Sequence, residues 1–349
     1  MQEVEPVDPP SGLVIEVLNE YGAITRGAVG RYLERREPRR HLYDPVADYP
    51  LRAGRMLRPS LLIAAGRAFG ADVESTLSSA VALELLHNAF LVHDDVEDEG
   101  LERRGRPTLN VLHGAPVAVN VGDALAALAL RPLLDNRRVL GPRLTLRVFE
   151  EAERMIRESI EGQAIELGWR RDNVVGLRDD DYLRMVLKKT CAYTTIFPMR
   201  VGALIGTRDG VPLDHLTRFG FFLGAAFQIQ DDLLNLVGDA KRYGKEINGD
   251  LWEGKRTLMI IRLFQRAAPL ELTRLIDALG GSRSERTEPQ VQWMRERLDG
   301  YGCIEHARAA AHALAGAARH EYDIALGALP ESRDKRFLWE LTHWVIRRS

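Results

Sequence analysis

The sequence predicts an all-α fold, and three observations lead to this class. Apolar residues recur at helical spacing along nearly all of the 349 residues. Runs that alternate with a period of two are essentially missing, and no alternation of strands and helices suggests a parallel sheet. Because no connection looks like an interdomain linker, we expect one all-α domain over residues 13–349.

The first 12 residues stand apart from the helical pattern. They are acidic and rich in proline, including Pro9 and Pro10, so they cannot bury apolar surface. We therefore expect residues 1–12 to form a flexible N-terminal arm.

The remaining elements are all expected to be helices, in order along the chain. Residues 13–36 place Val14, Val17 and Tyr21 on one face. Turn-rich or charged breaks are expected at 43–54, 134–142, 168–180, 207–211, 237–250 and 280–288. The later helices are predicted at 58–68, 76–98, 115–134, 143–168, 181–206, 212–237, 255–268, 270–279, 289–299, 305–328 and 336–347.

Composition excludes several classes of function. The net charge of −2 gives no electrostatic footprint for nucleic acid. Two cysteines rule out a disulfide scaffold and fit a reducing compartment. No stretch approaches the roughly 18 apolar residues of a membrane span, and the amino terminus lacks the order of a secretory signal. We expect a cytoplasmic protein that does not span a membrane.

A first acidic cluster, LVHDDVEDEG at residues 91–100, ends a long apolar helix. Asp94 and Asp98 are four residues apart, so their carboxylates share one face about 6 Å apart, whereas Asp95 is rotated away. Like charges at this spacing destabilise a helix unless a cation lies between them. Oxygen ligands without a nearby Cys suit a hard ion such as Mg²⁺. The alternative is a solvated acidic helix end, the usual role of an isolated acidic run.

A second acidic cluster, AAFQIQDDLLNL at residues 225–236, follows another long apolar helix. Asp231 and Asp232 lie among residues that are apolar nearly all round, where an unpartnered pair is costly to bury. Two such clusters in one chain weaken the surface interpretation of both.

Basic residues follow or precede both clusters, and lysine is rare in this chain. Of 48 basic residues six are Lys, and five of these fall between positions 188 and 255. A bound polyanion can satisfy both sets of residues. Mg²⁺ would bridge it to the carboxylates, and Arg and Lys would bind it directly. Diphosphate is the candidate that this arrangement favours.

The chain resembles the trans-isoprenyl diphosphate synthases of the polyprenyl synthetase family, which includes farnesyl and geranylgeranyl diphosphate synthases. The resemblance covers about residues 50–260 and rests on AGRMLRP, ELLHNAFLVHDDVED, RRGRPT, NVGDAL, EGQAIEL, KKT, FQIQDD, YGKEINGDL and EGKRTL in the family's order. It implies an isoprenoid synthase fold, a bundle of many helices around a deep central cavity, and a homodimer.

The resemblance also implies roles for individual residues. Mg²⁺, three ions with substrate bound, would be ligated by Asp94, Asp98 and Asp231, with support from Asp95 and Asp232. The allylic diphosphate would be held by Arg103, Lys189, Lys245 and Lys255. Isopentenyl diphosphate would be held by Arg55, Arg58, His87 and Arg104. Thr190 and Gln228 would line the reacting carbons, and Gln163 and Glu166 match a motif that orders metal-bound water.

Three positions depart from the family pattern. Arg55 stands where a Lys is common, which we expect to tune rather than abolish phosphate binding. Asn235 replaces the third Asp of the second cluster and leaves the outer contribution there in doubt. Glu166 replaces an Asp and is one methylene longer.

The implied reaction is head-to-tail prenyl transfer, with chain length set beside the first motif's helix. One helical turn rises 5.4 Å, roughly one extended isoprene unit. Counting back from Asp94, Phe90 is bulky, Ala89 leaves space, and Leu86 lies deeper. This pattern favours the C20 product geranylgeranyl diphosphate, with C15, or C25 and longer, as alternatives.

Two other functions remain open at this point. A class I terpene cyclase also ionises allylic diphosphates, but its second metal motif NDxxSxxxE is not found and it does not need the isopentenyl set. A non-catalytic partner subunit of another synthase would be expected to have lost aspartates that this chain keeps.

Overall fold

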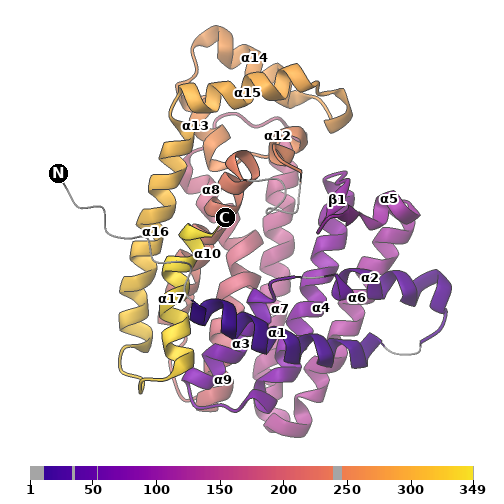
Figure 1. Ribbon diagram of the computed structural model, residues 1–349, viewed down its shortest axis with the longest axis vertical. Coiled ribbons are helices and arrows are strands. Elements are labelled where there is room, and N and C mark those ends of the chain that lie inside the picture. The colour runs from indigo at the N-terminus through magenta and orange to yellow at the C-terminus, as the bar shows by residue number, and fades with distance from the viewer. Residues whose placement is uncertain (1–11, 34–35, 53, 239–245, 349) are drawn as a thin grey trace.

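The computed structural model describes residues 12–33, 36–52, 54–238 and 246–348, and it is almost entirely helical (Figure 1). The expected all-α class is confirmed. Its one sheet among the described residues is a two-stranded antiparallel pair, β1 (Glu102–Arg103) and β2 (Arg106–Pro107). The predicted arm lies outside the described residues, apart from Gly12, which begins the first helix.

The helices follow the predicted order closely. They are α1 (Gly12–Leu33), η1 (Arg39–Tyr43), α2 (Asp44–Leu51), α3 (Leu57–Ala68), α4 (Val73–Glu97), α5 (Leu109–His113), α6 (Ala115–Asp135), α7 (Arg137–Arg171), α8 (Asp179–Val186), η2 (Leu187–Ile196), α9 (Phe197–Thr207), α10 (Asp214–Val237), α12 (Gly249–Glu253), α13 (Leu258–Arg266), α14 (Pro269–Gly280), η3 (Arg283–Glu285), α15 (Glu288–Gly300), α16 (Cys303–Leu326) and α17 (Arg333–Arg347).

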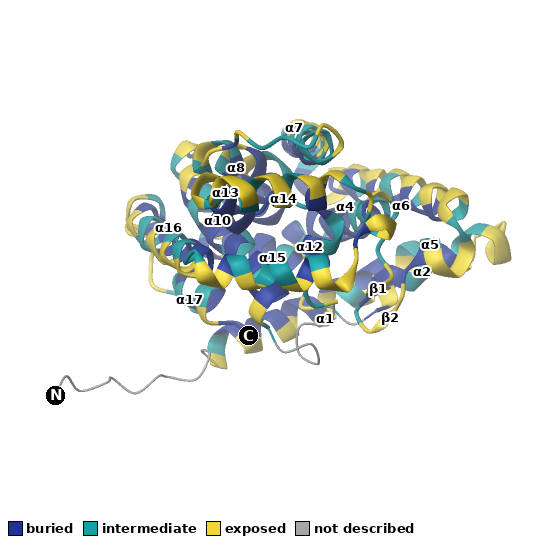
Figure 2. Cartoon of the chain, turned by 90° about the horizontal axis from the view of Figure 1, so that it is seen from above, coloured by how far each residue is buried: buried dark blue, intermediate teal, exposed yellow. Residues whose placement is uncertain are grey.

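Two hydrophobic cores hold the helices that carry the acidic clusters. One core joins α1, α3, α4, α6, α9 and α17, and α4 is buried on almost every face within it. The other packs the second half of α10 against α8, α13 and α16. Figure 2 shows the buried faces of these helices turned inward and the exposed faces of α6 and α16 turned outward. Both acidic clusters are therefore carried on rigid, buried supports.

The break expected at residues 43–54 is wrong in its first part. Residues 44–51 form α2, which begins with an Asp-Pro pair and buries Val46 and Tyr49. Proline is tolerated in the first turn of a helix, where its missing N–H has no partner in any case. Tertiary burial thus outweighs the turn-like composition of this segment.

The single helix expected at 181–206 is divided into α8, η2 and α9. Residues 187–196 are wound as a π-helix. Lys189, Thr190 and Tyr193, which lie on this segment, line one cavity. π-turns inside helices are frequent at functional sites.

Two described helices, α4 and α6, are long and apolar enough to cross a membrane by length and composition, so the expectation that no stretch would be is wrong. Within the chain, 72% of the apolar window of α4 and 44% of that of α6 is buried. A buried core helix of a soluble protein passes the same test, so this finding is weak evidence for a membrane.

Candidate active site

A cavity of about 1280 Å³ opens between α4, α7, η2 and α10. This volume exceeds the roughly 300–1,000 Å³ of ordinary small-molecule pockets. The predicted site residues on its wall are Arg55, Arg58, Leu86, His87, Ala89, Phe90, Asp94, Arg103, Arg104, Lys189, Thr190, Gln228, Asp231, Asp232 and Lys255. Asp94 and Asp231, from the two acidic clusters, thus share one cavity.

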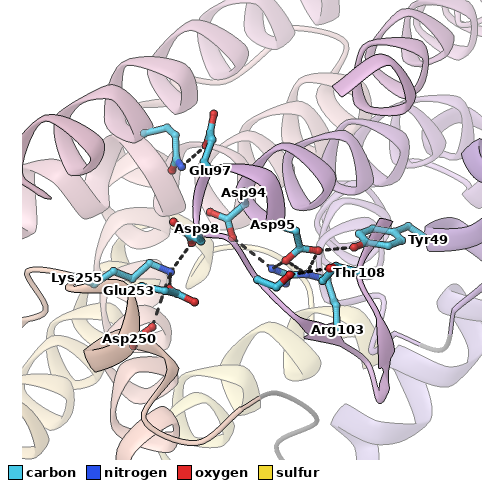
Figure 3. A network of polar contacts seen from close by, with 12 residues as sticks. Tyr49, Asp94, Asp95, Glu97, Asp98, Arg103, Thr108, Asp250, Glu253 and Lys255 are labelled. Carbon is cyan, nitrogen blue, oxygen red and sulfur yellow. Dashed lines mark hydrogen bonds and ion pairs between the residues drawn. The ribbon is translucent and has the colours of Figure 1, made fainter. Parts of the chain in front are cut away.

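Asp95 and Asp98 are buried and are not among the residues of the cavity wall, and Lys245 lies outside the described residues. Asp95 faces away from the cavity, as its rotation on the helix predicts. It accepts hydrogen bonds from Arg103 Nε at 2.8 Å and from the hydroxyl of Tyr49 (Figure 3). Asp95 therefore orients Arg103, whose Nη2 lies 3.3 Å from Asp94 Oδ2.

Asp98 caps the C-terminal end of α4 between two cations. Lys255 Nζ lies 2.8 Å from Asp98 Oδ2 (Figure 3). Arg170 of α7 pairs with the other carboxylate oxygen. Burial would raise the pKa of Asp98, but Lys255, together with Lys189 and Arg170, outweighs burial and lowers it. The carboxyl group is therefore held ionised.

Lys189 links the first acidic cluster to α7. Its Nζ lies 3.4 Å from Asp94 Oδ1 and also pairs with Glu166. Burial would lower the pKa of Lys189, but the carboxylates of Glu166 and Asp94 raise it, so the amine stays charged. One turn away on α7, Gln163 Nε2 donates to Glu97 at 2.5 Å, so both residues of the GQxxE motif face the first cluster.

The second cluster lies at the buried end of α10. Asp232 accepts hydrogen bonds from the hydroxyl of Tyr182 at 2.7 Å and from Gln228 Nε2 at 2.7 Å. Gln228 Oε1 in turn accepts from the hydroxyl of Thr190 at 2.9 Å, which connects α10 with η2. Burial raises the pKa of Asp232 to about 7. Asp231 also lines the cavity and is the more exposed of the two.

Asn235, which departs from the family pattern, binds backbone rather than facing the cavity. It is 3% exposed. Its Oδ1 accepts from the amide N–H of Asp250 at 3.0 Å, and its Nδ2 donates to the carbonyl of Glu246 at 3.3 Å. The amide has both a donor and an acceptor for these contacts, which a carboxylate would not have. Asn235 thus anchors the segment that leads to α12.

The predicted isopentenyl diphosphate residues gather on another part of the cavity wall. Arg58 lies 3.1 Å from His87 Nε2 and donates to the hydroxyl of Tyr193 at 3.0 Å. Arg104 Nη1 donates to the backbone carbonyls of Tyr49 and Arg52, both at 3.2 Å. Several cationic side chains therefore face the same cavity as the two acidic clusters, as two bound diphosphates would require.

The predicted chain-length residues lie below the first cluster on α4. Ala89 and Leu86 are buried and Phe90 is partly buried, and all three line the cavity. The ring of Phe90 meets that of Tyr193 edge-on, with centroids 5.5 Å apart. Apolar side chains of α6 and α7 also line the cavity, among them Ala126, Leu130, Ile156 and Ile160.

Sequence reasoning missed several residues of the site. Arg348, at the end of α17, lies 3.1 Å from Asp231 and stacks 3.9 Å from the ring centroid of Phe227. Arg170 and Tyr193 were likewise not singled out. Nothing in the terminal RRS sequence separates Arg348 from the many other arginines, although the YTT that follows KKT places Tyr193 one turn beyond Lys189.

By themselves, the side chains of the described residues provide only part of the ligand set that a divalent cation needs. No group of three or more His, Cys, Asp or Glu side chains converges within these ranges to hold a metal ion. The nearby donors are all carboxylate oxygens, the ligands that Mg²⁺ prefers. Mg²⁺ usually binds through one or two carboxylates and completes its shell with substrate phosphates and water. The donor set fits that mode of binding.

An all-α bundle with two carboxylate clusters and two basic sets around one cavity is typical of an enzyme that binds a polyanionic substrate through cations. The polyprenyl synthetase model matches residues 39–297. Geranylgeranyl pyrophosphate synthase of Geoglobus acetivorans is 30% identical over 337 residues, covering 97% of this chain and 100% of the relative.

Two solved structures have the same fold over almost their whole length. The geranylgeranyl pyrophosphate synthetase of Pyrococcus horikoshii is 29% identical, with a TM-score of 0.84, covering 97% of this chain and 98% of the other. The Caulobacter crescentus polyprenyl synthase, complexed with calcium and isoprenyl diphosphate, is 27% identical, with a TM-score of 0.83 and coverage of 98% and 99%. The chain belongs to the polyprenyl synthetase family and is a prenyltransferase.

Proposed function

We propose that the enzyme condenses isopentenyl diphosphate with an allylic diphosphate, head to tail, and releases geranylgeranyl diphosphate. The observation that carries this proposal is the shared cavity of about 1280 Å³, which Asp94, Asp231, Lys189, Lys255 and Arg58 line together. The Geoglobus relative, named a geranylgeranyl pyrophosphate synthase, supports the product class.

In this proposal the chain's own residues bind, orient and shield the substrates. Lys189, Lys255 and Arg103 hold the allylic diphosphate as its C–O bond breaks, and they neutralise the negative charge that develops on the leaving group. The oxygen dipoles of Thr190 and Gln228 face the allylic cation. The double bond of isopentenyl diphosphate forms the new C–C bond, and the proton lost from the adjacent carbon goes to the released diphosphate.

The isopentenyl diphosphate is held by Arg55, Arg58, His87 and Arg104 in this proposal. Buried apolar side chains of the cavity wall, Leu86 and Ala89 among them, keep water from the cation, which water would otherwise quench. Lys245 keeps its proposed role on the allylic diphosphate, supported by the family resemblance.

Mg²⁺ is the proposed cofactor, with Asp94, Asp98 and Asp231 as ligands and three ions in the substrate complex. When bound, it would neutralise the diphosphate and join it to both acidic clusters. The calcium in the Caulobacter structure supports a divalent cation in this fold.

The C20 length is proposed from the cavity below Asp94. Ala89 lines the wall one turn below the cluster and leaves the space that a larger side chain would close. Phe90 and Tyr193, whose rings meet edge-on, line the same cavity.

The test is incubation with labelled isopentenyl diphosphate, an allylic primer and Mg²⁺, followed by mass spectrometry of the products. Elongation to C20 supports the proposal. Cyclised hydrocarbon would identify a terpene cyclase, and absence of product with every primer would favour a partner subunit. Asp94→Asn and Asp231→Asn are the matched controls and should abolish elongation.

We also propose a homodimer and a cytoplasmic location. Apolar side chains on α5 and α6 are 41–55% exposed, namely Val111, Leu112, Val119, Leu130 and Leu134. A dimer would cover this face. The two buried, unpaired cysteines suit a reducing compartment. Analytical ultracentrifugation tests the dimer, and Val119→Glu should convert it to monomer.

A further inference from the structure

Arg286 lies in the connection between α14 and α15, outside every motif of the proposed site, yet it reaches the active-site segment. It is 7% exposed. Its guanidinium donates to the carbonyls of Ala278, Leu279 and Gly281 at 3.0, 3.0 and 2.7 Å, and to that of Trp252. The first three contacts satisfy carbonyls at the end of α14, as basic side chains often do. The contact with Trp252 in α12 has no such explanation.

The backbone beside Trp252 is shaped to receive this arginine. Gly254 has a φ of +72°, and a Cβ there would overlap Nη2 of Arg286. Glycine is therefore required for both the left-handed turn and the close approach. From the other side, Arg256 Nη1 donates to the carbonyl of Gly254 at 2.5 Å. The turn that precedes Lys255 is thus held between two buried arginines.

Burying Arg286 in this way costs folding free energy, so stability alone does not account for it. None of the hydrogen bonds that Arg286 makes with the described residues goes to a carboxylate. Burial, with Arg170 and Arg283 nearby, lowers the pKa of Arg286 to about 10. A buried cation whose hydrogen bonds all go to neutral carbonyls carries a desolvation cost that an apolar side chain would avoid, and the nearby carboxylates of Glu253 and Glu285 act in the opposite direction.

The connection between α14 and α15 also contacts the residues that lead into α12. Arg283 Nη2 pairs with Glu246, and its Nη1 lies 3.7 Å from Glu253. In Figure 1, α14 and α15 cap the end of the molecule where α12 lies, and Figure 2 shows α12 beside α15. The α14–α15 pair therefore contacts the segment that carries Lys255, and the side chain of Lys255 extends from this segment to Asp98.

We propose that Arg286 is a positioning residue for the prenyl transfer reaction, fixing the Gly254–Lys255 turn so that the Lys255 ammonium is aimed at Asp98 and at the allylic diphosphate. The inference rests on the proposed function for the identity of the ligand. Lys255 has a flexible stem with four methylenes, so its direction depends on the backbone that carries it. The chemical class of ligand is a diphosphate.

The test compares two variants. Arg286→Met keeps the apolar stem and removes the hydrogen-bond donors, whereas Arg286→Lys keeps the charge and removes the planar guanidinium with its several N–H donors. Both variants should weaken binding of inorganic diphosphate in the presence of Mg²⁺ by about tenfold in calorimetry. In steady-state assays the KM for the allylic substrate should rise by about the same factor, and the KM for isopentenyl diphosphate should stay within about twofold.

The matched control is Arg274→Met. Arg274 lies on α14 with its guanidinium 4.3 Å from the Trp293 ring centroid, so its loss loosens the same helical pair without touching the Lys255 turn. It should leave diphosphate binding unchanged.

Three results would overturn the inference: an equal defect in Arg274→Met, full recovery in Arg286→Lys, or equal rises in both KM values. Diphosphate binding needs no turnover. If wild type binds diphosphate and makes no prenyl product, the proposed function fails while the role of Arg286 is still tested.

Discussion

Ala89 is the residue on which the proposed product length depends most directly. It is fully buried and lines the cavity one turn below the acidic cluster. Ala89→Phe places a ring in the path of the growing chain, so the main product should shorten to C15. The series Ala89→Ser, Ala89→Leu and Ala89→Phe, assayed by mass spectrometry with excess isopentenyl diphosphate, should shorten the product with increasing side-chain size. An unchanged C20 product in Ala89→Phe would show that Ala89 does not set the product length.

Glu84 gives a prediction on stability against pH. It is buried on α4, and burial raises its pKa despite the opposing effects of Arg104 and Asn88. A raised carboxyl pKa favours the folded state below the unfolded pKa, and this contribution is lost as pH rises through the folded pKa. Glu84→Gln, neutral at every pH, should therefore melt at a higher temperature than wild type at neutral pH. The difference in melting temperature between the variant and wild type should shrink in acid. If that difference did not depend on pH, burial of the ionised carboxylate would not be its cause.

Single residues also mark the limit of what the sequence could predict. Asp94, Asp231, Lys189 and Lys255 were identified because their spacing and rarity are visible in the chain. Arg348 and Arg286 were not, because the contacts that tie them to the site, with Asp231 and Trp252, join residues far apart in the sequence. Arg348 reaches Asp231 across 117 positions. No local pattern distinguishes such an arginine from a solvated one.

At the scale of elements, helices were predicted well where a long apolar period decides the structure. The missed features depend on tertiary packing: α2, the π-wound η2, and α12 within a charged segment. In η2, Lys189, Thr190 and Tyr193 lie on a π-wound segment and line the cavity. A helical period of 3.6 residues cannot reveal this winding.

The crossing of α3 and α9 depends on Gly202. A Cβ there would lie 2.6 Å from Ala65 Cβ and from the backbone nitrogen of Gly66. Gly202→Ala should therefore separate the two helices and destabilise the fold by about 1–3 kcal/mol. Gly27→Ala on α1 is the control, because no atom lies within 4 Å of its Cβ, and it should stabilise by about 0.5–1 kcal/mol. Urea unfolding measures both; equal destabilisation would count against a packing cause.

At the scale of the whole molecule, the two cores bring segments that are far apart in the sequence to one electrostatic centre. Figure 3 shows the carboxylates of α4 already facing cations from other segments: Asp98 faces Lys255, and Asp94 faces Arg103. Asp231 pairs similarly with Arg348. The fold therefore balances these carboxylates with its own cations, and a metal ion must compete with them.

This competition predicts that Mg²⁺ and diphosphate bind cooperatively. Diphosphate draws Lys255, Lys189 and Arg103 away from the carboxylates, which frees oxygen ligands for the ions, and the ions in turn neutralise the diphosphate. Calorimetry should therefore give weak Mg²⁺ binding alone and binding tighter by at least about tenfold with saturating inorganic diphosphate, a coupling of about 1.4 kcal/mol. By reciprocity, Mg²⁺ should tighten diphosphate binding by the same factor. Chelation with EDTA should abolish turnover and leave the melting temperature nearly unchanged, because the ion pairs within the chain replace the metal. A large fall in melting temperature on chelation, or equal Mg²⁺ affinity with and without diphosphate, would mean that the carboxylates form a metal site independent of substrate.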